Sequence, residues 1–194
     1  MGGFFGVVAT EDCVSDLFFG TDYHSHLGTM RGGMAVWDAK GFQRAIHDIS
    51  NSQFRSKFES DYRRFSGACG IGVISDNEDQ PLVIASHLGV YAIVTVGVIT
   101  NSEALVRELF TRQPVQFSEM SRGGINPTEL VAMLINSQAT FGEGVRYAQQ
   151  RIEGSCSLVL LTDEGILFAV RDRYGRTPVV VGHKAGARAV ATES

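Results

Sequence analysis

Short apolar runs in the first half of the chain predict β-strands. The earliest run is rich in Phe and Val, and the run at residues 91–98 is strongly β-branched, as is typical of strands packed within a sheet. The strands predicted in this half are residues 4–10, 32–37, 70–75, 82–85 and 91–98. Near the end of the chain, four shorter runs separated by turn residues predict a meander of antiparallel strands. These runs are residues 157–161, 167–171, 178–182 and 187–191.

Apolar residues at helical spacing predict helices between some of these strands. A helix is expected at residues 15–26, with Ser15 as a possible N-cap. Its apolar face would carry Leu17, Phe18 and Tyr23. Within residues 42–65, apolar residues recur among charges at gaps that suit a helix, so this segment is predicted to be helical or partly irregular.

Three more helices are predicted in the middle of the chain. They cover residues 102–111, residues 128–138 with Thr128 as a possible N-cap, and residues 141–151. Strands at both ends of the chain and helices between them imply sheets packed against helices in layers.

Composition and charge narrow the classes of function. The chain has 194 residues, 44% of them hydrophobic and 20% charged, which is typical of one globular domain. A net charge of -4 gives no electrostatic reason to expect a nucleic acid or an anionic membrane as partner. No apolar run approaches the roughly 20 residues of a membrane-spanning helix. We therefore expect neither a nucleic acid nor a membrane partner.

The three cysteines predict a reducing compartment. Cys13, Cys69 and Cys156 are odd in number and far apart, which favours free thiols and a cytoplasmic protein. None of them belongs to a CxxC pair, and His24 and His26 lack an evident third ligand. We expect neither a metal site nor a cofactor.

Several motifs occur in a fixed order along the whole chain. They are residues 2–7, a segment with Tyr23, His26 and Gly28, residues 89–105, residues 154–182 and residues 190–194. Together they resemble the N-terminal class II glutamine amidotransferase domain of the amidophosphoribosyltransferases. The resemblance implies an α+β fold, a four-layer αββα sandwich of two mostly antiparallel sheets (the Ntn-hydrolase fold). It also implies that residues 1–194 form one such domain, truncated from a longer chain in which a C-terminal phosphoribosyltransferase domain follows.

The resemblance also shows where catalytic residues are replaced. Members of the family attack glutamine with an N-terminal cysteine, and Gly2 stands at that position. An arginine of the family holds the carboxylate of glutamine, and Ser75 stands in its place. An aspartate that binds the substrate amino group is replaced by Pro127.

The oxyanion hole is the fourth replaced feature. The family has an Asn-Gly pair that supplies one side-chain amide and one backbone N–H, and here the pair reads Val96-Gly97. Loss of one such donor typically costs about a hundredfold in rate. We expect no catalytic residue in this chain, and we take Thr95, Gly97 and His26 as the remaining candidates for ligand binding.

These replacements predict a catalytically degenerate glutaminase-type domain with a structural or regulatory role linked to purine biosynthesis. Its expected partners are the phosphoribosyltransferase domain of the same full-length chain and, in a homo-oligomer, further copies of the chain. Two alternatives stay open. In the first alternative, the chain is an active glutamine amidohydrolase that uses another cysteine. Cys13 is one such cysteine, although Glu11 and Asp12 beside it would raise the pKa of its thiol. In the second alternative, the chain is a domain that binds a small molecule. Val96 and Pro127 would make its cleft more apolar than a glutamine site.

Overall fold

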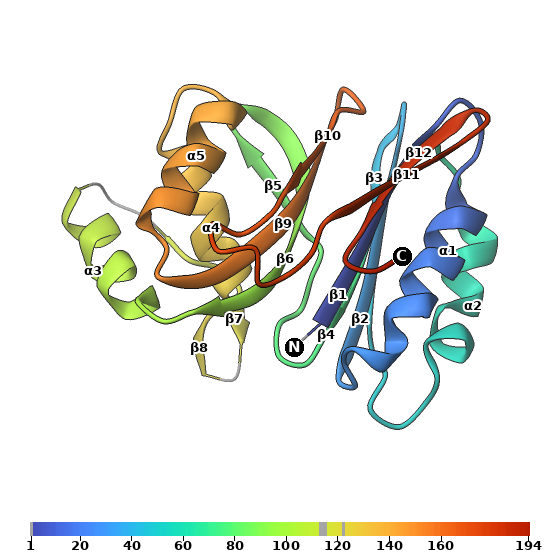
Figure 1. Cartoon of the computed structure of the whole chain (residues 1–194), viewed down its shortest axis with the longest axis horizontal. Helices are drawn as coiled ribbons and strands as arrows, with labels where there is room; N and C mark the ends of the chain where they lie inside the picture. Colours follow the sequence, from blue (N-terminus) through green and yellow to red (C-terminus); the bar gives the residue numbers. More distant parts are fainter. Residues whose placement is uncertain (1, 113–115, 122) are drawn as a thin grey trace.

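Two antiparallel β-sheets stack face to face, and helices cover both outer faces (Figure 1). This computed structural model describes residues 2–112, 116–121 and 123–194. The order of the layers, helix–sheet–sheet–helix, confirms the four-layer α+β fold predicted from the sequence.

The larger sheet has six strands in the spatial order β11–β12–β1–β4–β2–β3. Their bounds are β1 (Gly2–Ala9), β2 (Arg31–Asp38), β3 (Gly41–Asp48), β4 (Cys69–Ser75), β11 (Val180–Lys184) and β12 (Ala187–Ala191). Its outer face is covered by α1 (Val14–Tyr23), by the short 3-10 helix η1 (His24–His26) and by α2 (Phe54–Arg64).

The smaller sheet has four strands in the spatial order β10–β9–β6–β5. Their bounds are β5 (Leu82–Ser86), β6 (Gly89–Ile99), β9 (Gly154–Thr162) and β10 (Leu167–Val170). Two helices, α4 (Pro127–Asn136) and α5 (Phe141–Arg151), pack on its outer face, and α3 (Ser102–Arg112) lies beside α4. A two-stranded hairpin, β7 (Met120–Ser121) and β8 (Gly124–Ile125), precedes α4.

The apolar core has three layers. Leu17 is buried between α1 and the larger sheet, Phe4 and Val94 are buried between the two sheets, and Leu134 is buried between α4 and the smaller sheet. Strand β9 contributes to two of these layers, because Leu158 packs toward the helices and the next residue packs toward the other sheet. A strand that is buried on both faces is apolar at nearly every position, which is why this region reads as a continuous apolar run.

The expectation of a helical or irregular segment at residues 42–65 was wrong in its first part. Gly41–Asp48 forms strand β3, which pairs with β2, and only Phe54–Arg64 is helical. Phe42 and Ile46 are four residues apart, and residues four apart share a face in a strand as well as in a helix. The spacing alone therefore could not distinguish the two.

Both predicted N-caps were wrong. Helix α1 begins after Cys13, and the carboxylate of Asp12 accepts a hydrogen bond from the backbone N–H of Val14 at 3.1 Å. Helix α4 begins after Asn126, whose side-chain oxygen accepts from the N–H of Thr128 at 2.9 Å. Neither Ser15 nor Thr128 is therefore the cap. The predicted inner face of α1 was also wrong at one position, since 56% of Tyr23 is exposed.

The last four strands do not form a single meander. Strands β9 and β10 pair in the smaller sheet, whereas β11 and β12 pair in the larger one. The segment between them crosses from one sheet to the other through a turn at Asp172, a buried residue whose carboxylate accepts from the N–H groups of Tyr174 at 3.0 Å and Thr177 at 2.9 Å.

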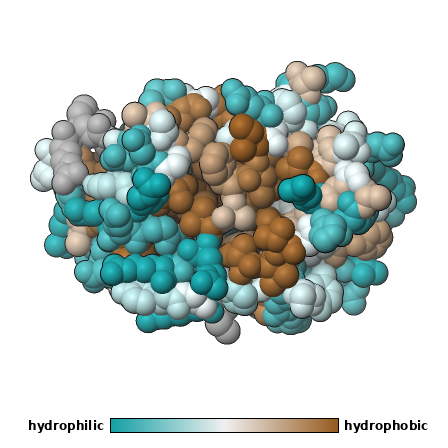
Figure 2. Space-filling view, turned by 45° about the horizontal axis from the view of Figure 1, so that its top comes forward, coloured by the Kyte–Doolittle hydropathy of each residue, from teal (hydrophilic) through white to brown (hydrophobic). Residues whose placement is uncertain are grey.

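The surface is divided by polarity. Figure 2 shows hydrophobic surface (brown) in the middle of one face and hydrophilic surface (teal) toward both ends. In the described part of the chain, no helix is long and apolar enough to cross a membrane.

All three cysteines are free and buried.

Candidate functional site

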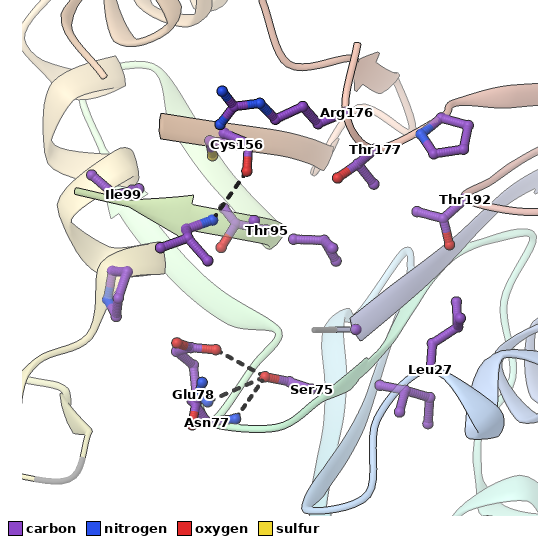
Figure 3. A pocket seen from close by; sticks show the side chains of 18 of the residues that line it. Leu27, Ser75, Asn77, Glu78, Thr95, Ile99, Cys156, Arg176, Thr177 and Thr192 are labelled. Atoms are coloured by element: carbon purple, nitrogen blue, oxygen red, sulfur yellow. Dashed lines mark hydrogen bonds between the residues drawn. The ribbon is translucent and has the colours of Figure 1, made fainter. Parts of the chain in front are cut away.

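A cavity of about 510 Å³ opens at one end of the two stacked sheets. Its volume lies within the range of small-molecule sites. Strands β1, β4 and β6, the first residue of α4 and the segment that crosses between the sheets all contribute to its walls (Figure 3). The residues that line it are Gly2, Leu27, Ile74, Ser75, Asn77, Glu78, Thr95, Val96, Gly97, Val98, Ile99, Pro127, Ser155, Cys156, Arg176, Thr177, Pro178, Thr192 and Glu193.

Six of the seven candidate residues line this one cavity, although they are spread over more than half of the chain. They are Gly2, Ser75, Thr95, Val96, Gly97 and Pro127. The larger sheet places two of them side by side, because Gly2 pairs with Ser75 across β1 and β4. The seventh, His26, lies outside the cavity, and its Nε2 is 2.8 Å from an oxygen of the cavity-lining Glu193.

Gly2 lies where the backbone leaves no room for a side chain. A Cβ atom added there would be 2.3 Å from the carbonyl oxygen of Ile74 and 3.4 Å from the Cα of Ser75. A side chain at this position therefore requires β1 to shift away from β4.

Ser75 uses its hydroxyl group to close a turn at the end of β4. Its Oγ accepts hydrogen bonds from the N–H groups of Asn77 and Glu78, both at 3.2 Å. The same hydroxyl donates to the carboxylate of Glu78 at 2.9 Å. The turn places the carboxylate of Glu78 at the wall of the cavity (Figure 3).

A buried hydrogen-bond network supports the wall that carries Thr95 and Pro127. The side chain of Gln80 donates to the backbone oxygen of Thr95 at 3.0 Å and accepts from its N–H at 2.8 Å. The hydroxyl of Thr128 donates to the same Gln80 at 3.0 Å, and it lies 2.7 Å from the hydroxyl of Thr95. Asn126 caps α4 and also donates to the backbone oxygen of Asp79 at 3.1 Å. Because their hydrogen-bonding groups are paired, these side chains hold the start of α4 against β6.

The Val96-Gly97 pair lies on β6 and lines the cavity. Val96 is 7% exposed. Gly97 has a φ of 147°, and a Cβ atom there would be 2.2 Å from the backbone oxygen of Ser155 on β9. Only glycine therefore fits between the two strands at this point.

Cys156 is the cysteine that lines the cavity. It belongs to the apolar layer beneath the helices, and burial, followed by the negative charge of Asp172, raises the pKa of its thiol to about 12. At neutral pH this thiol is almost entirely protonated, and the protonated form is a poor nucleophile.

Cys13 and Cys69 lie away from the cavity. The pKa of Cys13 is raised to about 12, first by burial, then by Cys69, Asp12 and Asp16. Burial, rather than the acidic neighbours named from the sequence, is therefore the main cause, and Glu11 is not among the causes. Burial also raises the pKa of Cys69.

Besides Cys156, three acidic or basic side chains on the cavity wall were not identified from the sequence as site residues. They are Glu78, Arg176 and Glu193. Arg176 is exposed, and its guanidinium lies 5.1 Å from the centre of the Tyr174 ring. The positions of all three follow from turns and chain ends, which periodicity does not reveal. Among the described residues, no group of three or more His, Cys, Asp or Glu side chains is arranged to hold a metal ion.

Comparison with known proteins shows a family to which the chain is similar. The model of a protein family described as "Glutamine amidotransferase domain" matches residues 68–194. An amidophosphoribosyltransferase of Methanocaldococcus jannaschii is 26% identical over 194 residues, an alignment that covers 94% of this chain and 40% of the relative.

Solved structures share the fold. The glutamine phosphoribosylpyrophosphate amidotransferase of B. subtilis, in complex with ADP and GMP, superposes with a TM-score of 0.83 at 20% identity, over 98% of this chain and 41% of that one. A class-II glutamine aminotransferase domain protein of Silicibacter pomeroyi superposes with a TM-score of 0.62 at 14% identity, over 97% of this chain and 87% of that one. The chain thus spans about two fifths of the length of the M. jannaschii and B. subtilis amidotransferases.

Proposed function

Since the chain belongs to the glutamine amidotransferase domain family, we propose that it is a member that does not hydrolyse glutamine. Its role is structural or regulatory within an enzyme related to amidophosphoribosyltransferase, and thus linked to purine biosynthesis. The relative from M. jannaschii, which carries that name, supports the link to this enzyme class.

The position of Gly2 is the observation that carries the proposal. Covalent hydrolysis of an amide by this family needs a thiolate at the start of β1, and Gly2 has no side chain. The carbonyl oxygen of Ile74, 2.3 Å from the Cβ position, also closes the space that such a side chain would enter.

No other cysteine supplies the missing group. Cys156 is the cavity-lining cysteine, and its thiol has a pKa of about 12. The glutamine amidohydrolase alternative requires this thiol to ionise beside a general base. The described lining residues include no histidine that could act as that base.

The groups that would recognise glutamine are also changed. The carboxylate of glutamine would meet the carboxylate of Glu78 beside Ser75, and like charges repel. The wall at Val96 and Pro127 offers no side-chain amide for the oxyanion and no carboxylate for the amino group.

Within a longer chain, the domain would support a phosphoribosyltransferase domain that takes free ammonia as its nitrogen source. Assembly of several copies of the chain belongs to the same proposal. A full-length protein should therefore form product with ammonium salts and not with glutamine.

The direct test measures ammonia release from glutamine by the purified 194-residue chain, together with labelling by 6-diazo-5-oxo-norleucine. We expect no release above the uncatalysed rate and no covalent adduct by mass spectrometry. A Gly2→Cys variant should also be inactive. The groups that would bind glutamine and its oxyanion are missing as well, and the backbone leaves no space for a side chain at Gly2. Stoichiometric labelling of the unmodified chain would refute the proposal.

A further inference from the structure

We propose that the cavity binds a small organic cation, with its ammonium group at Glu78 and an apolar body against the surrounding walls. This inference rests on the proposed function, because a cavity freed from glutamine hydrolysis can accept another ligand. It names the chemical class of that ligand.

Glu78 is a fixed carboxylate, which makes it suitable as an anchor. Its oxygen Oε2 accepts from the hydroxyl of Ser75, and its own N–H is bonded to the same hydroxyl. Ser75 is 5% exposed, so the group that orients the carboxylate is itself buried. Within the described part of the chain, the second oxygen, Oε1, has no hydrogen-bond partner and can accept from a ligand. A charge-assisted hydrogen bond from an ammonium group would complete this arrangement.

The rest of the cavity wall is mainly apolar. It presents aliphatic side chains and proline rings, namely Leu27, Ile74, Val96, Val98, Ile99, Pro127 and Pro178. The hydroxyl of Thr95 is engaged by Thr128, and that of Thr192 accepts from the N–H of Phe4 at 3.3 Å. A ligand of about 510 Å³ or less would therefore bury an apolar body here and need few polar groups.

The other charged groups favour a cation over an anion. Glu193 is already next to His26, which leaves Glu78 as the carboxylate for the ligand. Arg176 lies on the opposite side of the cavity from Glu78 (Figure 3), and it is exposed and stacked on Tyr174. An exposed guanidinium contributes little to binding in a solvated position, whereas a half-buried carboxylate held by Ser75 contributes more.

The test compares three ligands with the same apolar body and different charge. They are 3-methylbutylamine, which is protonated at pH 7, the neutral 3-methyl-1-butanol, and the anion 4-methylpentanoate. Binding to the 194-residue chain is measured by calorimetry and by the shift of the unfolding midpoint. We expect the amine to bind at least about tenfold more tightly than the alcohol, and the acid not to bind.

Matched variants identify the anchor. Glu78→Gln removes the charge but keeps an oxygen that can accept from Ser75, and it should weaken amine binding by about tenfold or more. Glu193→Gln and Arg176→Gln change the other two charged lining residues and should alter amine binding by less than about twofold. Circular dichroism of each variant checks that the fold is kept.

Three results would overturn the inference: tighter binding of the acid than of the amine, unchanged amine binding by Glu78→Gln, or no binding of any of the three compounds. The proposed loss of glutaminase activity is measured separately, by ammonia release. A chain that binds no amine and releases no ammonia would refute the ligand assignment alone. A chain that hydrolyses glutamine would refute the proposed function as well.

Discussion

Two walls of the cavity are built in different ways. The α4 wall, formed by Thr95 and Pro127, is supported from behind by Gln80, Thr128 and Asn126, whose side chains are joined by hydrogen bonds. The η1 wall, formed by Leu27, Thr192 and Glu193, is held by contacts that involve the backbone or are exposed to solvent. They include the two hydrogen bonds between Thr192 and Phe4 and the exposed contact between His26 and Glu193.

The short helix η1 beside this wall contains polar atoms that have no partner in the described part of the chain. These are Nε2 of the buried His24 and the hydroxyl of Ser25. A buried polar atom without a partner costs about 1–3 kcal/mol, so the helix beside this wall is held less firmly than α4. We therefore expect changes in the network behind the α4 wall to cost more stability than changes in the exposed contacts of the η1 wall. The following experiments test that difference.

The largest effect is expected for Gly33→Ala, which disrupts the support of the α4 wall. A Cβ atom at Gly33 would lie 1.8 Å from the backbone oxygen of Gln80, so the segment that carries Gln80 would be displaced. We expect a loss of about 3 kcal/mol or more in the free energy of unfolding, measured with urea. Gly182→Ala is the control, since no atom lies within 4 Å of its Cβ position, and it should change stability by about 0.5 kcal/mol or less. A change below about 1 kcal/mol for Gly33→Ala would contradict the prediction.

Gln80→Ala should have the next largest effect. It leaves the N–H and oxygen of Thr95 and the hydroxyl of Thr128 without their partner in a buried place. The expected loss is about 2–3 kcal/mol by urea unfolding. The control is Gln138→Ala, whose side chain makes an exposed contact with Ser137, and it should be near neutral. Equal effects of the two variants would show that the network does not stabilise the wall.

His24 should make stability depend on pH. Burial lowers the pKa of His24 below its ordinary value of 6.5, although the bond to Gly20 and the charge of Glu193 act in the opposite direction. The unfolded chain therefore binds the proton first, and the stability that the neutral ring provides is lost as pH falls below about 6.5. Urea unfolding at pH 7.5, 6.5 and 5.5 should show a smaller loss for His24→Gln than for the unmodified chain. His183→Gln, on the exposed strand β11, should keep the full pH dependence. An unchanged slope for His24→Gln would contradict this account.

The smallest effect is expected for the contact between His26 and Glu193. The two side chains are 54% and 35% exposed, and solvent screens such pairs. A double-mutant cycle with His26→Gln and Glu193→Gln should give a coupling of about 0.5 kcal/mol or less. A coupling above about 1 kcal/mol would contradict this prediction.

Much of the fold was predictable from local patterns. Helix α5 spans Phe141–Arg151, as predicted, because its apolar spacing matches one helical face and its N-terminal boundary has a clear cap: the hydroxyl of Thr140 accepts from the N–H of Glu143 at 3.2 Å. Strand β3 was missed because apolar residues four positions apart share one face both in a helix and in a strand. The caps of α1 and α4 were missed because several neighbouring residues can cap, and tertiary contacts decide among them. At α4 the hydroxyl of Thr128 is bonded to Gln80.

The site was predictable only through the resemblance to a family. That resemblance led to six residues that the fold gathers at one cavity, since strand pairing brings Gly2 next to Ser75 and packing of the sheets brings Val96 close to both. It could not identify Glu78, whose place depends on a turn that this chain makes after β4. The position of Cys156 at the cavity was also missed, because a residue near the start of a central strand can pack in the core and still border an opening at the end of the sheet.

The pairing of β1 with β12 has a consequence for how the chain folds. Phe5 pairs with Ala191, so one long edge of β1 finds its neighbour only when residues 187–191 have been made. The other edge is satisfied earlier, by β4. During translation, and in refolding, the open edge of β1 can pair with other chains until the end of the domain arrives. Contacts between residues so far apart in the sequence slow folding. A chain that ends before β12 should therefore accumulate as aggregate, and its yield of soluble protein should show how much folding depends on the pairing of β1 with β12.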